Sequence, residues 1–185
     1  MLDAATIAAE VNRGDRSARD TIAGALTSTA AQQERLNVAT LIDDERALER
    51  AEAIDEMVES GRSPGPLAGV PVALKDLIDH EGRVTTCGSG FYRHEATESA
   101  ECVRRLEAAG AVIVSRTVLH EFAYGFSSEN DWTGPVRNPL DPELSNRGPG
   151  RDEVRLRPRP GNPEPRPGRA LPDPLGRIRG LGRGS

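Results

Sequence analysis

Lys75 is the only lysine in the 185-residue chain, and all the other basic residues, 23 of the 24, are arginine. A lysine amine can lose its proton when its surroundings disfavour the cation, whereas an arginine guanidinium stays protonated. A site that needs a neutral amine as a base can therefore use lysine but not arginine. We interpret Lys75 as a candidate general base. The alternative is an ordinary solvated surface lysine, which is the commonest role of this residue type.

A cysteine nucleophile is a second chemistry that the residue types allow. Cys87 would need His80, His94 or His120 as its base. Nothing in the spacing links these residues, and a small buried thiol is the commoner role of such a cysteine. The cysteines and histidines form no C-x-x-C or H-x-x-x-H pair, and the chain has no P-loop and no dinucleotide fingerprint. We therefore expect neither a metal nor a cofactor.

The segment "EFAYGFSSEN" (121–130) holds three of the six aromatic residues of the chain. Tyr124, Ser127 and Ser128 lie within it. An aromatic surface beside polar groups is typical of a substrate pocket, and these three residues are candidates for substrate binding. A core turn followed by a polar loop explains the same pattern, so both interpretations stay open.

The elements expected around Lys75 are those of an α/β sheet. "VPVAL" (70–74) predicts a buried strand that ends at Lys75, with Gly-rich loops before and after it in the sequence. Residues 98–110 predict an amphipathic helix, and "AVIVS" (111–115) predicts a strand covered on both faces. This order of strand, helix and strand favours a parallel unit. Open sheets of this kind carry functional groups just beyond the carboxyl ends of their strands, which is where Lys75 stands.

The first part of the chain predicts mainly helices. Apolar periodicity indicates one helix up to Gly14, a second starting at Ser17, and a third over 43–60 that ends at Gly61, with a short strand at 38–42. We divide the chain into an N-terminal helical region (1–62), a partial α/β core (63–144) and a tail (145–185). The expected fold class is α/β, with the N-terminal helices packed on part of a mixed sheet.

The tail differs in composition from the body. Residues 1–144 carry 14 basic and 25 acidic residues, whereas 145–185 carry 10 arginines and 4 acids, with 8 Pro and 8 Gly in 41 positions. Such a segment buries too little apolar surface to fold, so we expect disorder. Binding of nucleic acid to the arginines is a possible role, but the tail lacks aromatic residues for base stacking. The chain has two cysteines, no membrane-length apolar stretch and no signal-peptide pattern at its start, which favours a cytoplasmic location.

Four segments in order resemble the amidase signature family: "GPLAGVPVALKDLID", "TTCGSG", "ECVRRLEAAGAVIVSRTVLHEFAYGFSSEN" and "GPVRNPLD". The resemblance runs from about Pro64 to Pro142. It implies a Ser–cis-Ser–Lys amidohydrolase acting on small-molecule amides, in which a lysine after the G-V-P-V strand is the ultimate base. Lys75 matches that position, and Tyr124 and the "GFSSEN" loop match a segment that lines the substrate pocket of the family. This explains why arginine does not replace Lys75.

The sequence departs from the family after "NPLD". The family continues there into "GGSSGGS", which carries the bridging serine, and later into "DTGGS", which carries the nucleophile. Neither motif is present, and the only later serines are Ser145 and Ser185. We therefore expect this chain to be inactive as written. Because GC-rich codons read out of frame give Arg, Pro and Gly, we hypothesise that residues from about 145 onward are a frameshifted translation.

Two alternatives to a stand-alone amidase remain. One is the A subunit of a glutamyl-tRNA or aspartyl-tRNA amidotransferase, with the other amidotransferase subunits as partners. His120 before "EFAYG" resembles the stand-alone amidases more, since the tRNA-linked subunits often have Asp there. The other is a non-enzymatic fragment whose basic tail binds nucleic acid.

Overall fold

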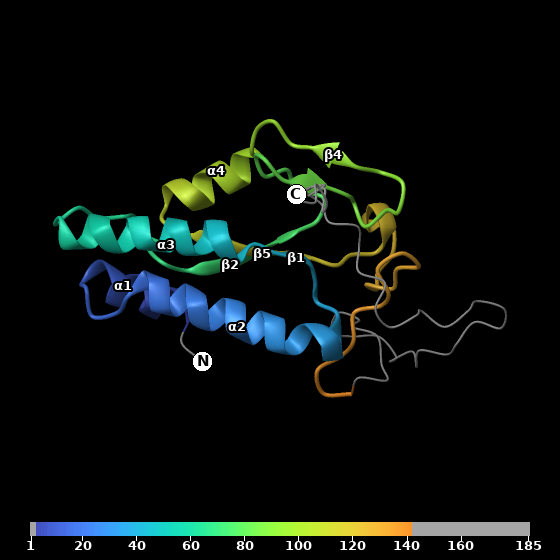
Figure 1. The fold of residues 1–185 in the computed structure, drawn as a ribbon, viewed down its shortest axis with the longest axis horizontal. Coiled ribbons are helices and arrows are strands. Elements are labelled where there is room, and N and C mark those ends of the chain that lie inside the picture. The colour runs from blue at the N-terminus through green and yellow to red at the C-terminus, as the bar shows by residue number, and fades with distance from the viewer. Residues whose placement is uncertain (1–2, 142–185) are drawn as a thin grey trace, which may run out of the picture.

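The computed structural model describes residues 3–141, which form four α-helices, a three-stranded sheet and a two-stranded hairpin (Figure 1). In chain order the elements are α1 (Ala4–Asn12), α2 (Ala18–Leu36), β1 (Ala39–Ile42), α3 (Asp44–Glu59), β2 (Pro71–Lys75), β3 (Val84–Thr85), β4 (His94–Glu95), α4 (Glu101–Ala108), β5 (Val112–Thr117) and a 3-10 helix (Glu121–Ala123). The helices and longer strands lie where the sequence predicts them. The β3–β4 hairpin and the 3-10 helix were not predicted.

Local signals set the ends of α2. The Ser17 hydroxyl accepts a hydrogen bond from the backbone N–H of Asp20 at 3.1 Å, so Ser17 is the N-cap of α2, where the sequence predicts that a helix starts. The helix ends at Asn37, whose φ of 54° lies in the left-handed region that asparagine tolerates better than most residues. The side chain of Asn37 also donates to the carbonyl oxygen of Thr133 at 2.8 Å. The end of α2 is thereby tied to the residues that follow the segment 121–130.

The main sheet is mixed, with strand order β1–β5–β2. β5 pairs antiparallel with β1 and parallel with β2, and α4 lies in the connection between the two parallel strands. The parallel register pairs Pro71 with Val112 and Lys75 with Thr117. The carboxyl ends of β2 and β5 therefore coincide, as the predicted parallel unit requires.

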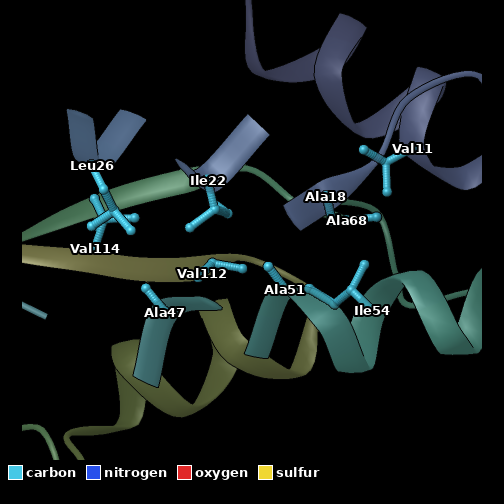
Figure 2. Close-up of a cluster of buried hydrophobic side chains, with 10 residues drawn as sticks. All are labelled: Val11, Ala18, Ile22, Leu26, Ala47, Ala51, Ile54, Ala68, Val112 and Val114. Carbon is cyan, nitrogen blue, oxygen red and sulfur yellow. The ribbon is translucent and has the colours of Figure 1, made fainter. Parts of the chain in front are cut away.

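Two apolar clusters pack on opposite faces of β5. Val112 and Val114 join a cluster with α1, α2 and α3, which includes Ile22 and Ile54 (Figure 2). Ile113, whose side chain alternates with theirs along the strand, joins Leu74 of β2 and Val103 of α4 in the second cluster. Figure 1 accordingly shows α2 and α4 on opposite sides of the sheet. The prediction that this strand is covered on both faces is confirmed.

The prediction of a buried strand at 70–74 was wrong for most of β2. Leu74 is buried, whereas Pro71 and Val72 are half-buried and Ala73 and Lys75 are exposed. The physical reason is its place in the sheet, because β2 is an edge strand among residues 3–141. Its apolar sequence is typical of a strand with neighbours on both sides.

Several expectations fall on residues that the structure does not describe. The boundary at Leu144, the disorder of 145–185, its frameshift origin and its binding of nucleic acid all lie outside the described residues. Within residues 3–141, none of the helices has the length and apolar character needed to cross a bilayer.

Candidate active site

Lys75 lies in a hollow at the carboxyl ends of β2 and β5. The hollow has a volume of about 540 Å³. Its lining includes Lys75, Thr117 at the end of β5, and His120 just beyond it. Ser127 and Ser128, two of the three predicted substrate-binding residues, line the same hollow. Residues more than 50 positions apart in the sequence therefore meet where the sheet ends, as expected for an α/β site.

The described residues do not enclose Lys75. It is the last residue of the edge strand β2 and is exposed. Burial is one of the means by which a protein favours the neutral form of a lysine. Residues 3–141 alone do not bury Lys75. Full enclosure of Lys75 would need further polypeptide over the open side of the hollow.

Tyr124 is not brought into the hollow. Its side chain is 92% exposed, and it is absent from the lining, although its neighbours Ala123 and Gly125 are present. The chain bends sharply here, since Phe122 and Ala123 both have left-handed φ angles, of 51° and 56°. Such angles are costly for residues with a side chain and recur at functional loops. A substrate-binding role for Tyr124 stays a prediction.

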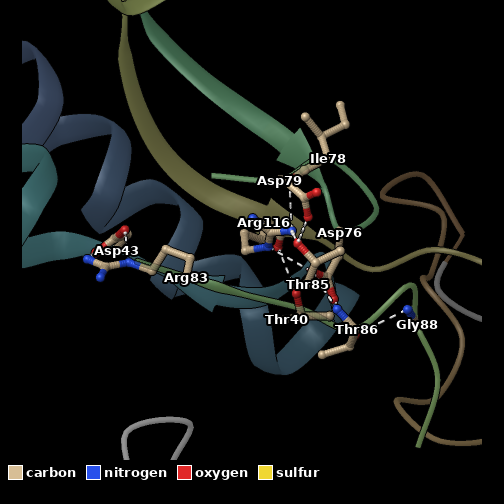
Figure 3. A network of polar contacts seen from close by, with 10 residues as sticks. All are labelled: Thr40, Asp43, Asp76, Ile78, Asp79, Arg83, Thr85, Thr86, Gly88 and Arg116. Carbon is tan, nitrogen blue, oxygen red and sulfur yellow. Dashed lines mark hydrogen bonds and ion pairs between the residues drawn. The ribbon is translucent and has the colours of Figure 1, made fainter. Parts of the chain in front are cut away.

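A buried polar network fixes the turn that follows Lys75 (Figure 3). Arg116 of β5 donates from Nε to Asp76 Oδ1 at 2.7 Å, and the two side chains are 3% and 1% exposed. Nη2 of Arg116 donates to the carbonyl oxygen of Ile78 at 3.0 Å and to Thr85 Oγ1 at 3.1 Å. Thr86 donates its hydroxyl proton to Asp76 Oδ2. The first residues after Lys75 are thus held to β5 and to the β3 segment.

Asn130 ties together three segments, one of which lines the hollow through Leu119. Its Nδ2 donates to the carbonyl oxygens of Gly88 at 2.6 Å and Leu119 at 2.8 Å, and its Oδ1 accepts from the N–H groups of Trp132 and Thr133. A Cβ atom at Gly88 would lie 2.8 Å from Asn130 Nδ2, so this approach requires glycine. The buried side-chain amide of Asn130 therefore holds these segments together.

Cys87 is poorly suited to act as a nucleophile. Burial, followed by the nearby carboxylates of Asp76 and Asp79, raises the pKa of its thiol above the ordinary value of 9.0. Within residues 3–141, no hydrogen bond joins the thiol to a histidine. His80 instead contacts Glu107 at 3.2 Å, and the ring of His94 lies 3.8 Å from Asp79. The structure thus favours a structural role for this cysteine.

His80 belongs to a second hollow, of about 470 Å³, lined by residues of α3 and α4 that include Arg50 and Glu107. The imidazole is 2% exposed, and burial, followed by the charge of Arg46, lowers its pKa below 6.5. The described part of the chain has no cluster of three or more His, Cys, Asp or Glu placed to hold a metal ion.

Three residues of this region, Asp76, Arg116 and Asn130, were not singled out by the sequence. Asp76 stands beside Lys75, but its partner Arg116 lies 40 positions away, next to the last residue of β5 and directly after the predicted strand at 111–115. An arginine there gives no sign that it is buried. Asn130 is the last residue of the segment 121–130, and its bonds depend on loops that only the folded chain brings together.

The comparisons with known proteins agree with this fold. The family model described as amidase matches residues 20–148, and the chain belongs to this family. It is 37% identical over 141 residues to the A subunit of glutamyl-tRNA(Gln) amidotransferase from Lachnospira eligens, covering 76% of this chain and 29% of that protein. It is 44% identical over 130 residues to the AtzE subunit of 1-carboxybiuret hydrolase from Pseudomonas sp. (strain ADP), covering 69% of this chain and 28% of that protein.

Solved structures show the same likeness. A protein from a structure described as a vestigial complex that reveals the origins of an s-triazine catabolic enzyme superposes with a TM-score of 0.75 at 40% sequence identity. The match covers 78% of this chain and 32% of that one. The chain therefore spans about a third or less of the length of the relatives it matches.

Proposed function

We propose that Lys75 is the base of an amide-hydrolysing site of the amidase type. The observation that carries the proposal is the meeting of the only lysine with Ser127 and Ser128 in one hollow at the carboxyl ends of two parallel strands. Family membership supports it, since the resemblance implies that Lys75 matches the family's catalytic lysine. The hollow is open on one side, which leaves access for a small-molecule amide.

The proposed reaction is acyl transfer. The neutral amine of Lys75 takes a proton through a bridging serine from a nucleophilic serine, whose oxygen attacks the amide carbonyl. The C–N bond breaks, the amine leaves with a proton, and water then hydrolyses the acyl ester. Both serines, with the backbone N–H groups that stabilise the oxyanion, belong to motifs absent from this sequence. We therefore propose that this chain alone does not turn over an amide.

Ser127 and Ser128 are proposed to contact the substrate. Their hydroxyl groups can donate to a carbonyl oxygen or accept from an amide N–H. Tyr124 is proposed for the same role only if further polypeptide covers it, because its side chain is exposed and does not line the hollow formed by residues 3–141.

A chimera tests this function. The aligned part of the 1-carboxybiuret hydrolase AtzE protein is replaced by the matching residues of this chain, and hydrolysis of 1-carboxybiuret is measured beside the parent protein. The proposal predicts a folded chimera that hydrolyses this substrate, and an inactive Lys75→Met variant of it. A chimera that melts cooperatively but has no activity, or one that keeps its activity without Lys75, would contradict the proposal.

A second candidate is the A subunit of an aminoacyl-tRNA amidotransferase. Several of the similar curated proteins carry that name, at 37–41% identity. This function predicts that the chain co-purifies with the other amidotransferase subunits when they are expressed together. Isolation of the chain without them, at matched expression levels, would count against it.

A further inference from the structure

Several hydrogen bonds hold the turn that follows Lys75, although Lys75 ends an edge strand. The carbonyl oxygen of Lys75 accepts from the N–H groups of Leu77 at 2.8 Å and Ile78 at 3.0 Å, which closes the turn. Arg116 then holds both ends of it, through the carboxylate of Asp76 and the carbonyl oxygen of Ile78. The backbone that carries Lys75 is thereby fixed to the central strand β5.

A second set of contacts fixes the same turn from the other side. The hydroxyl of Thr86 donates to the carboxylate of Asp76, and the backbone carbonyl oxygen of Asp76 accepts from the N–H of Cys87 at 2.8 Å. Thr85 joins Arg116 to Asp79 through its Oγ1, which donates to Asp79 Oδ1 at 2.7 Å. The turn is therefore clamped between β5 and residues 85–87.

The ion pair between Arg116 and Asp76 is expected to contribute little net stability, so we look for another role. A buried salt bridge recovers little more than the cost of removing its charges from water, and apolar residues of similar size often stabilise as well. Among residues 3–141, no hydrogen-bond partner reaches the buried Nη1 of Arg116, which adds a further cost. What the pair does supply is direction, because the planar guanidinium holds its acceptors in a fixed geometry.

We propose that Asp76 and Arg116 are positioning residues for Lys75. Their ion pair, in the contacts shown in Figure 3, holds the end of β2 in one conformation, so that the Lys75 amine enters the hollow from a fixed backbone. The functional meaning of this role rests on the proposed base function of Lys75, but the positioning itself does not depend on turnover.

The single lysine makes a direct test practical. Labelling with 15N-lysine gives one backbone amide signal, that of Lys75, in the otherwise unlabelled 185-residue chain. Its order parameter separates a rigid backbone, about 0.85, from a flexible one, below about 0.6. We expect the wild-type value near the rigid limit, and a fall below about 0.6 in Arg116→Met and Asp76→Asn.

The matched control is Arg83→Met. Arg83 forms a similar two-pronged pair with the buried Asp43, at 2.7 and 2.6 Å, without a contact to the turn at 75–78. A general loss of stability would affect both arginine variants, whereas positioning predicts that Lys75 stays rigid in Arg83→Met. Thr86→Val removes the hydroxyl contact to Asp76, together with the bond that this hydroxyl accepts from the N–H of Gly88 at 3.1 Å, and leaves Arg116 in place. It carries the test if Arg116→Met does not fold, and a measurable fall in the order parameter of Lys75 is expected.

The outcomes separate this inference from the proposed function. A rigid Lys75 in folded Arg116→Met, or in Thr86→Val if the arginine variant is unfolded, would overturn the positioning role. An equal loss of order in Arg83→Met would overturn it as well. An inactive, folded chimera with the hydrolase would instead overturn the base function and leave the positioning result intact.

Discussion

Asn130 donates from Nδ2 to the carbonyl oxygen of Gly88 at 2.6 Å and so joins two loops that are 42 residues apart. The same amide group holds Leu119, at the rim of the hollow that contains Lys75. One buried side chain therefore sets the distance between the loop after β3 and the loop after β5.

Replacing this residue should destabilise the protein measurably. Asn130→Ala leaves the carbonyl oxygens of Gly88 and Leu119 without their buried donor, and each such group costs about 1–3 kcal/mol. We expect a lower midpoint in urea unfolding. Asn12→Ala is the control, because Asn12 also bonds two carbonyl oxygens but is exposed, so water can replace it. Equal effects of the two substitutions would show that the buried contacts of Asn130 do not contribute the expected stability.

The thiol of Cys87 should react slowly with alkylating reagents. Its raised pKa, caused first by burial and then by Asp76, leaves little thiolate at neutral pH. Cys102 is exposed on α4 and serves as an internal control in the same molecule. Mass spectrometry after timed exposure to iodoacetamide at pH 7 should find Cys102 modified first. Faster modification of Cys87 than of Cys102 would contradict this prediction and support Cys87 as a nucleophile.

Stability should fall as the pH drops below about 6.5, the ordinary pKa of histidine. Burial, and then the charge of Arg46, lowers the pKa of His80 in the folded chain, while the carboxylates of Glu107 and Asp43 partly oppose this shift. The unfolded chain therefore binds a proton that the folded chain does not, and acid favours unfolding between the two pKa values.

Urea unfolding between pH 5 and 8 measures this effect. His80→Gln should weaken the loss of stability toward low pH, because it removes the buried imidazole. His94→Gln removes an exposed imidazole instead and controls for the loss of a histidine as such. A pH dependence that His80→Gln leaves unchanged would show that the burial of His80 is not its cause.

Local patterns in the sequence predicted the elements whose interactions lie close along the chain. Apolar positions at steps of three and four marked α3, and the run at 111–115 marked β5. The β3–β4 hairpin was not predicted because its strands have only two residues each, which is too few for a periodic pattern.

The residues of the candidate site also fall into those that a local pattern reveals and those that only the folded chain brings together. Lys75 was identifiable because its residue type is unique and it ends a strand. Arg116 was not, because its acceptors come from residues 76, 78 and 85, which only the folded chain brings to β5. Tyr124 was chosen for its aromatic character, but the left-handed bend at Phe122 and Ala123 turns its ring toward solvent.

The choice of lysine over arginine is the central claim about the site. The most direct measurement is the rate of 1-carboxybiuret hydrolysis by the chimera with Lys75 and with Lys75→Arg. Arginine keeps the positive charge and the long side chain but cannot give the neutral base. The account predicts that kcat falls by about 10²–10⁴-fold, the usual contribution of a general base, in a chimera that remains folded. Activity within about threefold of the parent chimera, on the same scale, would show that Lys75 is not the base.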